Sequence, residues 1–567
     1  MAAPPSLRAA PGAGPAGPVE PAGAMRIALW ILGPLLAVVA YFYGLDSIHI
    51  PGIGDEALYT QIARVTAASG RWLPLRWEHG INDTKPPMLF WQAIVTTARG
   101  THFNHWTLRG PIVLYSLAVA LLAGLLAWRL SGRRTTGLLA GMIYLGFLST
   151  VQQGRPFLIN APETFFLFAP LVLVMLAPRL DGRAVLACGL CLGMAALYKS
   201  FFLVAAGTAG IGCVLFRRSD LDPGRWLGRY GAFCLAIALI GLAVFSLWLA
   251  LDPHPELVVR QFVGHENAGK FRAEGFVGGL FTGRYTIFRI WLGDFANAGL
   301  YAVLLAGFLV LTLRTRASLT LPEREIWWYV LAFLVVYSFP AQRQENYILP
   351  TCAALAVLMA LRWQAIGPAW FVVSHALVGV VLLLSLGVRL RIEQLAGARL
   401  FTALDYGSVA LGLLLVATGL ARGPWRRELF PLAVFVVLLS ESLFLQPFSR
   451  HFSAATCARL DGATVYFPST SVESQEKYRF VLPGARVAGY VGSPLPWLTE
   501  STFVAIRVPY GHPLPGGVRP IEEIRSLRTR HSPREIRDMV LRGRLDLLAD
   551  RLVIVEPARG AKAAAER

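Results

Sequence analysis

Long apolar runs separated by short polar segments dominate the chain from residue 25 onward. A helix needs about 20 mostly apolar residues to cross a bilayer, and about thirteen runs approach that length. They lie near residues 25–43, 110–130, 136–152, 161–178, 184–199, 200–216, 229–251, 293–313, 325–340, 347–364, 367–388, 402–421 and 427–446. The pattern predicts a polytopic α-helical membrane protein.

The arginines between these runs predict the orientation of the chain. Short cytoplasmic loops are enriched in Lys and Arg, and arginines cluster in every second loop if the N-terminus is cytoplasmic. These clusters lie at 129–134, 179–183, 217–229, 314–324, 362 and 422–427. One outer segment, with Arg389, Arg391 and Arg399, departs from the alternation.

Both ends of the chain differ from the apolar middle, residues 25–447. Residues 1–24 are mostly Ala, Pro and Gly, which predicts a disordered cytoplasmic tail. Residues 448–567 contain short β-rich runs at 463–467, 486–490, 502–506 and 552–555, and a helical stretch at 532–548. An odd number of crossings places these residues outside, and we expect a soluble periplasmic α/β domain there.

Composition supports the membrane prediction. The chain is 55% hydrophobic and 15% charged, with a mean hydropathy of +0.53. The net charge of +19 could suggest a nucleic-acid partner, but the basic residues cluster between apolar runs, so we expect none. Five of the six cysteines lie inside apolar runs, which favours helix packing over disulfides for pairs such as Cys188 and Cys191.

Polar residues gather in the outer segments, chiefly the loops 45–108 and 252–292. The first loop contains two stretches with the apolar spacing of helices that lie in the membrane interface, at 56–69 and 88–97. Cations from five outer segments could surround a phosphate or pyrophosphate: Lys85, Arg155, Lys199, Lys270 and Arg343. Asp55 or Glu56 could act as a base or orient a reactant.

A metal site has weaker support. His79 and His265 could bind a divalent ion such as zinc together with Glu78 or Glu266, but no H-x-x-x-H or H-E-x-x-H spacing occurs. We therefore expect no required metal or cofactor.

Several motifs in residues 55–350 resemble the polyprenyl-phosphate-dependent membrane glycosyltransferases of the GT-C class. They are Asp55-Glu56-x-x-Tyr59, Gly70 with Trp72 and Pro74, Asp83-x-Lys85-Pro86-Pro87, Arg155 to Pro162, Lys199, Glu266-Asn267-x-x-Lys270, and Arg343-x-x-x-Tyr347-x-x-Pro350. Within that class they most resemble the lipid A aminoarabinose transferases, which are related to protein O-mannosyltransferases. Asn160 departs from the Asp of many relatives, and Lys270 from a frequent Arg.

The resemblance implies Asp55, Glu56 and Lys85 as catalytic residues. It implies a further set that binds substrate: Tyr59, Asp83, Arg155, Asn160, Lys199, His265, Glu266, Asn267, Lys270, Arg343 and Tyr347. It also implies a GT-C fold in the bacterial inner membrane, and a donor sugar linked to undecaprenyl phosphate that is transferred with inversion on the periplasmic side.

Three functions stay open. The first is transfer of a sugar such as 4-amino-4-deoxy-L-arabinose to a lipid A phosphate. The second is transfer of a hexose or another sugar to a protein, a glycan or another lipid by the same machinery. The third is transport of a lipid-linked substrate, which predicts polar residues near the bilayer midplane and internal repeats. The polar residues instead gather at one face, which favours an enzyme.

Overall fold

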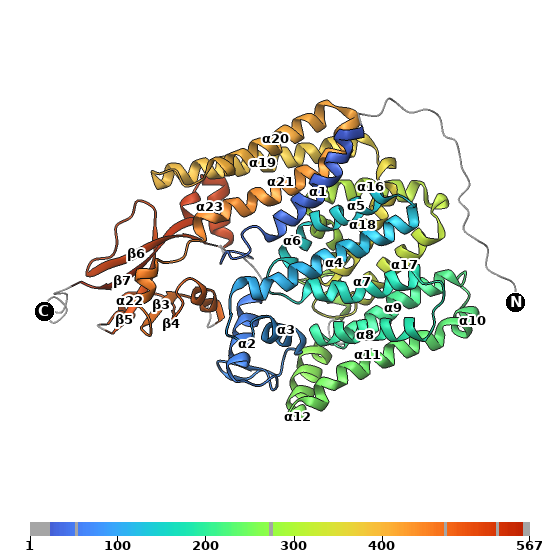
Figure 1. Cartoon of the computed structure of the whole chain (residues 1–567), viewed down its shortest axis with the longest axis horizontal. Coiled ribbons are helices and arrows are strands. Elements are labelled where there is room, and N and C mark those ends of the chain that lie inside the picture. The colour runs from blue at the N-terminus through green and yellow to red at the C-terminus, as the bar shows by residue number, and fades with distance from the viewer. Residues whose placement is uncertain are drawn as a thin grey trace.

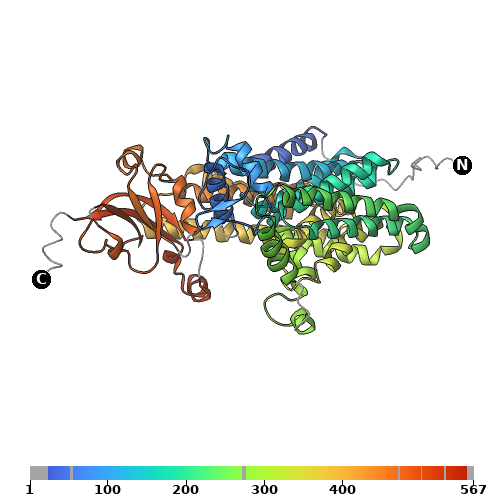
Figure 2. The same ribbon diagram turned by 90° about the horizontal axis from the view of Figure 1, so that it is seen from below.

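The computed structural model describes residues 23–50, 55–270, 276–469, 473–499, 501–528 and 532–558. A helical bundle makes up most of it, and a sheet domain lies at one end of that bundle in both views (Figure 1, Figure 2). The predicted tail lies outside the described residues, apart from Gly23 and Ala24, which begin the first helix.

Every predicted apolar run coincides with a helix. The helices that coincide with these runs are α1 (Gly23–Phe42), α4 (His105–Ser131), α5 (Arg134–Gly146), the short α6 (Leu148–Gly154), α7 (Asn160–Leu176), α8 (Gly182–Tyr198), α9 (Phe202–Arg218), α11 (Ala232–Leu251), α16 (Ala302–Arg314), α17 (Leu321–Val336), α18 (Leu349–Arg362), α19 (Pro368–Ala396), α20 (Ala403–Ala421) and α21 (Arg426–Leu445). The run at 136–152 is divided between α5 and α6 at Phe147, whose backbone is extended.

Among the described residues, seven helical segments are long and apolar enough to cross a membrane. They are His105–Ser131, Pro223–Leu251, Gly293–Arg314, Glu345–Ala365, Pro368–Ala396, Ala403–Ala421 and Gly423–Phe448. Trp30–Phe42, Asn160–Leu176 and Gly182–Tyr198 are apolar but shorter. The protein is therefore a multi-pass membrane protein, and the number of thirteen crossings stays a prediction.

Short elements connect the long helices. They are α2 (Glu56–Ala68), β1 (Arg76–Trp77), β2 (Gly80–Ile81), α3 (Met88–Thr96), α10 (Pro223–Trp226), α12 (Pro255–Val258), η2 (Val259–Asn267), α13 (Phe276–Phe281), α14 (Phe288–Trp291), α15 (Gly293–Ala298) and η6 (Glu345–Ile348). The predicted interface helices at 56–69 and 88–97 correspond to α2 and α3, which pack on each other.

One apolar core joins the helices of the bundle. Glycines allow close approach between them: a Cβ on Gly137 of α5 would lie 2.6 Å from the carbonyl oxygen of Gly124 in α4. Small residues at such crossings are typical of membrane helices, because lipid supplies no hydrophobic force to hold helices together and close packing must do so.

Arg389, one of the three arginines of the outer segment that departs from the alternation, has a packing role. Its side chain is completely buried between α19 and α21, where Nη2 donates to the carbonyl and hydroxyl oxygens of Ser440. The guanidinium also lies over the rings of Phe401 and Phe444. A buried arginine with these partners serves packing, so it does not contribute to the orientation signal.

The C-terminal residues form a five-stranded sheet of order β4-β3-β5-β7-β6. Its elements are α22 (Ala454–Arg459), β3 (Thr464–Pro468), η10 (Glu473–Phe480), β4 (Arg486–Tyr490), β5 (Thr502–Pro509), β6 (Val518–Leu527), α23 (Pro533–Arg542) and β7 (Ala549–Pro557). β3 is parallel to β4 and β5, whereas β7 is antiparallel to β5 and β6. The predicted helix at 532–548 is shorter, since it ends at Gly543 in a left-handed conformation.

Candidate functional site

A cavity of about 660 Å³ opens at the end of the bundle that carries α2 and α3. It is bordered by the first outer loop, α6 and the start of α7, the junction of α8 and α9, η2, and the segment between α17 and α18. Eight of its lining residues carry the chemistry discussed below: Asp55, Tyr59, Lys85, Asn160, Lys199, Glu266, Asn267 and Tyr347. Outer segments that are far apart in sequence thus meet around one space.

Asp55 lies directly before α2 and lines the cavity wall. The Tyr59 hydroxyl, one turn later, donates to Asp55 Oδ2 at 3.4 Å. Burial, together with the neighbouring Asp55 carboxylate, raises the pKa of the Tyr59 phenol well above its ordinary value. Tyr59 therefore stays protonated and orients Asp55 as a hydrogen-bond donor.

Lys85 reaches the same cavity from the segment after the β1–β2 hairpin. Pro86 and Pro87 follow it and lead directly into α3, which restricts the backbone there. In the part of the chain that the structure describes, no carboxylate pairs with the Lys85 ammonium. This charge is thus available to an anionic ligand.

Glu56 is turned away from the cavity and holds the first loop in place. Its carboxylate accepts from Arg109 Nε at 2.6 Å and Nη2 at 3.0 Å, and from the Phe157 amide at 2.8 Å. Arg109 is almost fully buried in α4 and also donates to the carbonyls of Leu45 and Ser47. The two adjacent acids therefore have different surroundings: Asp55 faces the cavity, and Glu56 anchors the start of α2.

Lys199 is paired inside the cavity wall. Its Nζ donates to both carboxylate oxygens of Glu163 at 2.9 and 2.8 Å. The same ammonium lies 4.6 Å from the centre of the Tyr347 ring, a cation–π arrangement. Glu163 is 2% exposed, so much of the Lys199 charge is neutralised before any ligand arrives.

The motif around residue 266 reaches the cavity in part. Glu266 and Asn267 line it, and Asn267 is fixed by Ser200, whose hydroxyl donates to Asn267 Oδ1 at 2.6 Å. His265 is exposed and does not line the cavity. The Lys270 side chain lies outside the described residues.

Arg155 and Arg343, two cations expected at a phosphate, are instead buried in the protein. Arg155 donates to the carbonyls of Tyr41 and Tyr43 and to the Ser442 hydroxyl. Arg343 donates to the carbonyls of Ser338 and Tyr285, at 2.7 and 2.9 Å. Neither arginine lines the cavity, so the two support the outer segments from within the protein. Asp83 does not line the cavity either.

The cavity wall also contains polar residues that the sequence motifs did not indicate. Arg284 lines it from the loop before α14, and Glu345 lines it while pairing with Arg289 at 2.9 Å. Five further side-chain amides join the predicted Asn160 and Asn267 in the wall: Gln152, Gln153, Gln342, Gln344 and Asn346. Arg284 lies in an outer loop and could have been found there as an outer cation, but single amides carry no such signal.

The described residues hold no group of three or more His, Cys, Asp and Glu side chains that could bind a metal ion. His79 lies against the Trp77 ring, at 4.9 Å between ring centres. That no metal or cofactor is required stays a prediction.

Residues 56–255 match the family of dolichyl-phosphate-mannose-protein mannosyltransferases. The matched residues run from the start of α2 to the start of α12. The match begins at Glu56, beside Asp55, and includes Lys85, Asn160 and Lys199 of the cavity wall. A search of curated protein sequences found no match.

The fold of the chain is similar to that of ArnT from Cupriavidus metallidurans. The crystal structure of ArnT bound to undecaprenyl phosphate has a TM-score of 0.60 and 16% identity, and the match covers 94% of this chain and 98% of ArnT. The apo state of ArnT gives a TM-score of 0.57 with the same identity and coverage. The resemblance to GT-C glycosyltransferases predicted from the loop motifs is confirmed by the family domain and the fold.

Proposed function

We propose that this protein transfers a sugar from undecaprenyl phosphate to an acceptor at the periplasmic face of the bacterial inner membrane. The observation that carries the proposal is the cavity at one end of the bundle, where Asp55 and the Lys85 ammonium line the same wall. The similarity of the fold to ArnT, which was crystallised with undecaprenyl phosphate, supports this donor class. No nucleotide sugar would be needed.

The chemistry that fits this wall is a single displacement. The acceptor oxygen forms a bond to the anomeric carbon while the bond from that carbon to the phosphate oxygen breaks, which inverts the configuration. Negative charge grows on the departing phosphate, and Lys85 stabilises it, aided by Arg284 at the same cavity. A cation placed where negative charge develops in the transition state lowers the activation barrier of the transfer most.

The role of Asp55 depends on the acceptor. A lipid A phosphate is already ionised near neutral pH and needs no base, so Asp55 would orient the reactants or bind the ammonium of an amino sugar. An alcohol acceptor must lose a proton, and Asp55 would take it as the attack proceeds. Our first candidate is transfer of 4-amino-4-deoxy-L-arabinose to a lipid A phosphate.

A second candidate, transfer of a neutral sugar such as a hexose, is favoured by the amides in the wall. A side-chain amide both donates and accepts hydrogen bonds, which suits hydroxyl groups. Asn346 Oδ1 is buried and has no hydrogen-bond partner among the described residues. Buried polar atoms are normally satisfied, so a hydroxyl of a bound sugar is a suitable partner for it.

The test uses the full-length protein in lipid nanodiscs with two donors, undecaprenyl phosphate linked to aminoarabinose or to a hexose. Mass spectrometry follows lipid A and the released undecaprenyl phosphate. A mass shift of lipid A with the aminoarabinose donor supports the first candidate, and hexose consumption with an alcohol acceptor supports the second. Consumption of neither donor, with lipid A or with an alcohol acceptor, contradicts the proposal.

Lys85→Ala links the result to the site. We expect transfer to fall about 10²-fold, as when one group that stabilises developing charge is removed. Arg71→Ala is the matched control, because Arg71 is an exposed cation of the same loop that does not line the cavity. Equal activity of both variants would remove Lys85 from the reaction.

A further inference from the structure

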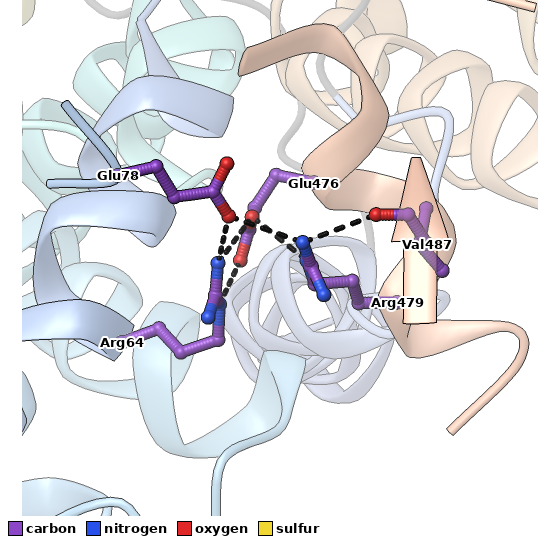
Figure 3. A network of polar contacts seen from close by, with 5 residues as sticks. All are labelled: Arg64, Glu78, Glu476, Arg479 and Val487. Carbon is purple, nitrogen blue, oxygen red and sulfur yellow. Dashed lines mark hydrogen bonds and ion pairs between the residues drawn. The ribbon is translucent and has the colours of Figure 1, made fainter. Parts of the chain in front are cut away.

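The C-terminal domain is joined to the first outer loop by a closed ring of four charged side chains (Figure 3). Arg64 of α2 donates to both carboxylate oxygens of Glu476 in η10, at 2.6 and 3.0 Å, and to Glu78 at 2.8 Å. Arg479, also in η10, donates to Glu78 at 3.1 Å and to Glu476 at 3.2 Å. Each arginine therefore contacts both acids.

The first outer loop and the C-terminal domain contribute equally to this ring. The first outer loop supplies Arg64 and Glu78, and the C-terminal domain supplies Glu476 and Arg479, so each side brings one cation and one anion. Opposite charges alternate around the ring, and a shift of η10 along α2 would bring like charges together. Such complementary charges fix register more than they add affinity.

Burial makes Glu476 the critical member. Its side chain is 1% exposed, against 29% for Arg64, 28% for Glu78 and 26% for Arg479. A buried carboxylate is costly unless paired, so displacing α2 from η10 would leave Glu476 with only one of its two cations. The arrangement penalises any movement that separates the two segments.

A second contact beside the ring fixes the same junction. The Phe480 ring, at the end of η10, stacks on Phe103 with 6.0 Å between ring centres and lies 4.0 Å from the His105 ring. Ile48, which lies in the first outer loop before α2, belongs to the apolar cluster of the C-terminal domain. Polar and apolar contacts thus hold the domain to the same loop.

The positions of Asp55 and Lys85, two of the residues that the first outer loop brings to the cavity, depend on this junction. Asp55 begins α2, the helix that carries Arg64, so a rotation or shift of α2 moves the Asp55 carboxylate. Glu78 lies in the turn of the β1–β2 hairpin, and the chain after the hairpin leads to Lys85. Neither Glu476 nor Arg479 lines the cavity, and both act on it only through these elements.

We propose that Glu476 and Arg479 are positioning residues of the transferase, through which the C-terminal domain sets the places of Asp55 and Lys85. The consequence for transfer rests on the function proposed above. The mechanical coupling between η10 and the first outer loop does not, and it can be measured without any substrate.

The deciding variant is Glu476→Gln, which keeps the shape of the side chain and removes its charge. We expect faster hydrogen–deuterium exchange in residues 56–68 of the full-length protein, because Arg64 of α2 loses its charged contact with Glu476. Exchange in residues 76–81 should also rise, because the two arginines that pair with Glu78 lose their shared partner. Transfer should fall about tenfold or more, since small displacements of reacting groups are costly. Arg551→Gln is the matched control, because it breaks an ion pair of the same domain, Arg551 with Glu523, far from the ring in sequence and outside η10.

A four-residue exchange of charges tests whether the ring itself is responsible. The variant Arg64→Glu, Glu78→Arg, Glu476→Arg and Arg479→Glu inverts every charge and keeps the alternation. We expect exchange in 56–68 and transfer to return toward the wild-type values. A purely structural role of individual side chains predicts further loss instead.

The outcomes separate the two proposals. If Glu476→Gln melts like the wild type and leaves both exchange and transfer unchanged, the positioning role is overturned. If Glu476→Gln does not fold, Arg479→Gln is used in the same way, because Arg64 still neutralises Glu476 in it. If the wild type transfers no sugar, the proposed function fails, whereas the exchange data still decide whether η10 controls α2.

Discussion

Asp55 and Glu56 are adjacent acids with different roles, because their carboxylates have different surroundings. Among the described residues, the Asp55 carboxylate has one hydrogen-bond partner, the Tyr59 hydroxyl at 3.4 Å, and Asp55 lines the cavity. Glu56 has a bidentate arginine and a backbone amide as partners. The two acids belong to one sequence motif, but a carboxylate that binds a ligand needs oxygen lone pairs that the protein does not already occupy. Of the two, Asp55 has more of these among the described residues.

We therefore expect opposite effects from matched substitutions. Asp55→Asn should lower transfer about 10²-fold or more, as expected when a group acting on the attacking oxygen is lost, and should leave the melting temperature unchanged. Glu56→Gln should destabilise the protein by about 3 kcal/mol, because the buried Arg109 loses its counter-charge. Thermal melting and transfer assays of both purified variants check this. A stable Glu56→Gln protein would contradict the anchoring role.

The pair of Lys199 and Glu163 is a second test at the scale of single residues. Lys199→Met leaves the buried Glu163 carboxylate unpaired and should cost about 3 kcal/mol or more. The double variant with Glu163→Gln should recover most of that loss, which a double-mutant cycle measures as coupling. Arg551→Gln, in the more exposed pair with Glu523, should cost less than about 1 kcal/mol. Additive losses in the cycle would show that the pair contributes nothing.

At the scale of elements, close helix crossings depend on glycines. A Cβ on Gly137 would lie 2.6 Å from the Gly124 carbonyl and 2.9 Å from Trp128 Cβ, so α4 and α5 must move apart. Gly137→Val should destabilise the protein by about 1–3 kcal/mol, the usual cost of overpacking. Gly387→Val in α19 is the control, because nothing lies within 4 Å of its Cβ position. Melting curves in detergent compare the two, and equal stability would contradict the close crossing.

The strands show where local patterns are sufficient and where they fail. β3, β4, β5 and β7 overlap the short β-rich runs that predicted strands, because residues of high strand propensity gather there. β6 was not predicted, since its sequence Val518–Leu527 carries Arg519, Glu522, Glu523 and Arg525. An edge strand exposes one side to solvent and tolerates such charges, and only pairing with β7 identifies it.

At the scale of the whole molecule, α2 and α3, whose residues line the cavity, lie toward the end of the bundle that carries the sheet domain (Figure 1). The arginine clusters predict that this end is periplasmic. In a protein without its native cysteines, Val491→Cys, 76% exposed in the sheet domain, should react with a membrane-impermeant maleimide added to the periplasm. Arg183→Cys, exposed at the start of α8, should react only after permeabilisation. The reverse result would invert the proposed orientation.

The sequence by itself determined the membrane class, the positions of the helices and the set of outer segments that carry polar chemistry. These follow from local properties: apolar runs of spanning length, arginines in alternate loops, and motifs within single segments. The tertiary structure decided which polar groups face the cavity. Arg155 and Arg343 look like ligand-binding cations in the sequence, but they donate to backbone carbonyls inside the protein. Lys85, by contrast, lines the cavity and has no paired acid among the described residues.

The same distinction applies to the C-terminal domain. Its sequence shows strands and charges but no catalytic motif, and nothing local connects Glu476 with Arg64, which lies 412 residues earlier. Hydrogen bonds between distant segments depend on how whole elements dock, and docking follows from the summed packing of the chain. For that reason, the link between this domain and the cavity was visible only in the folded molecule.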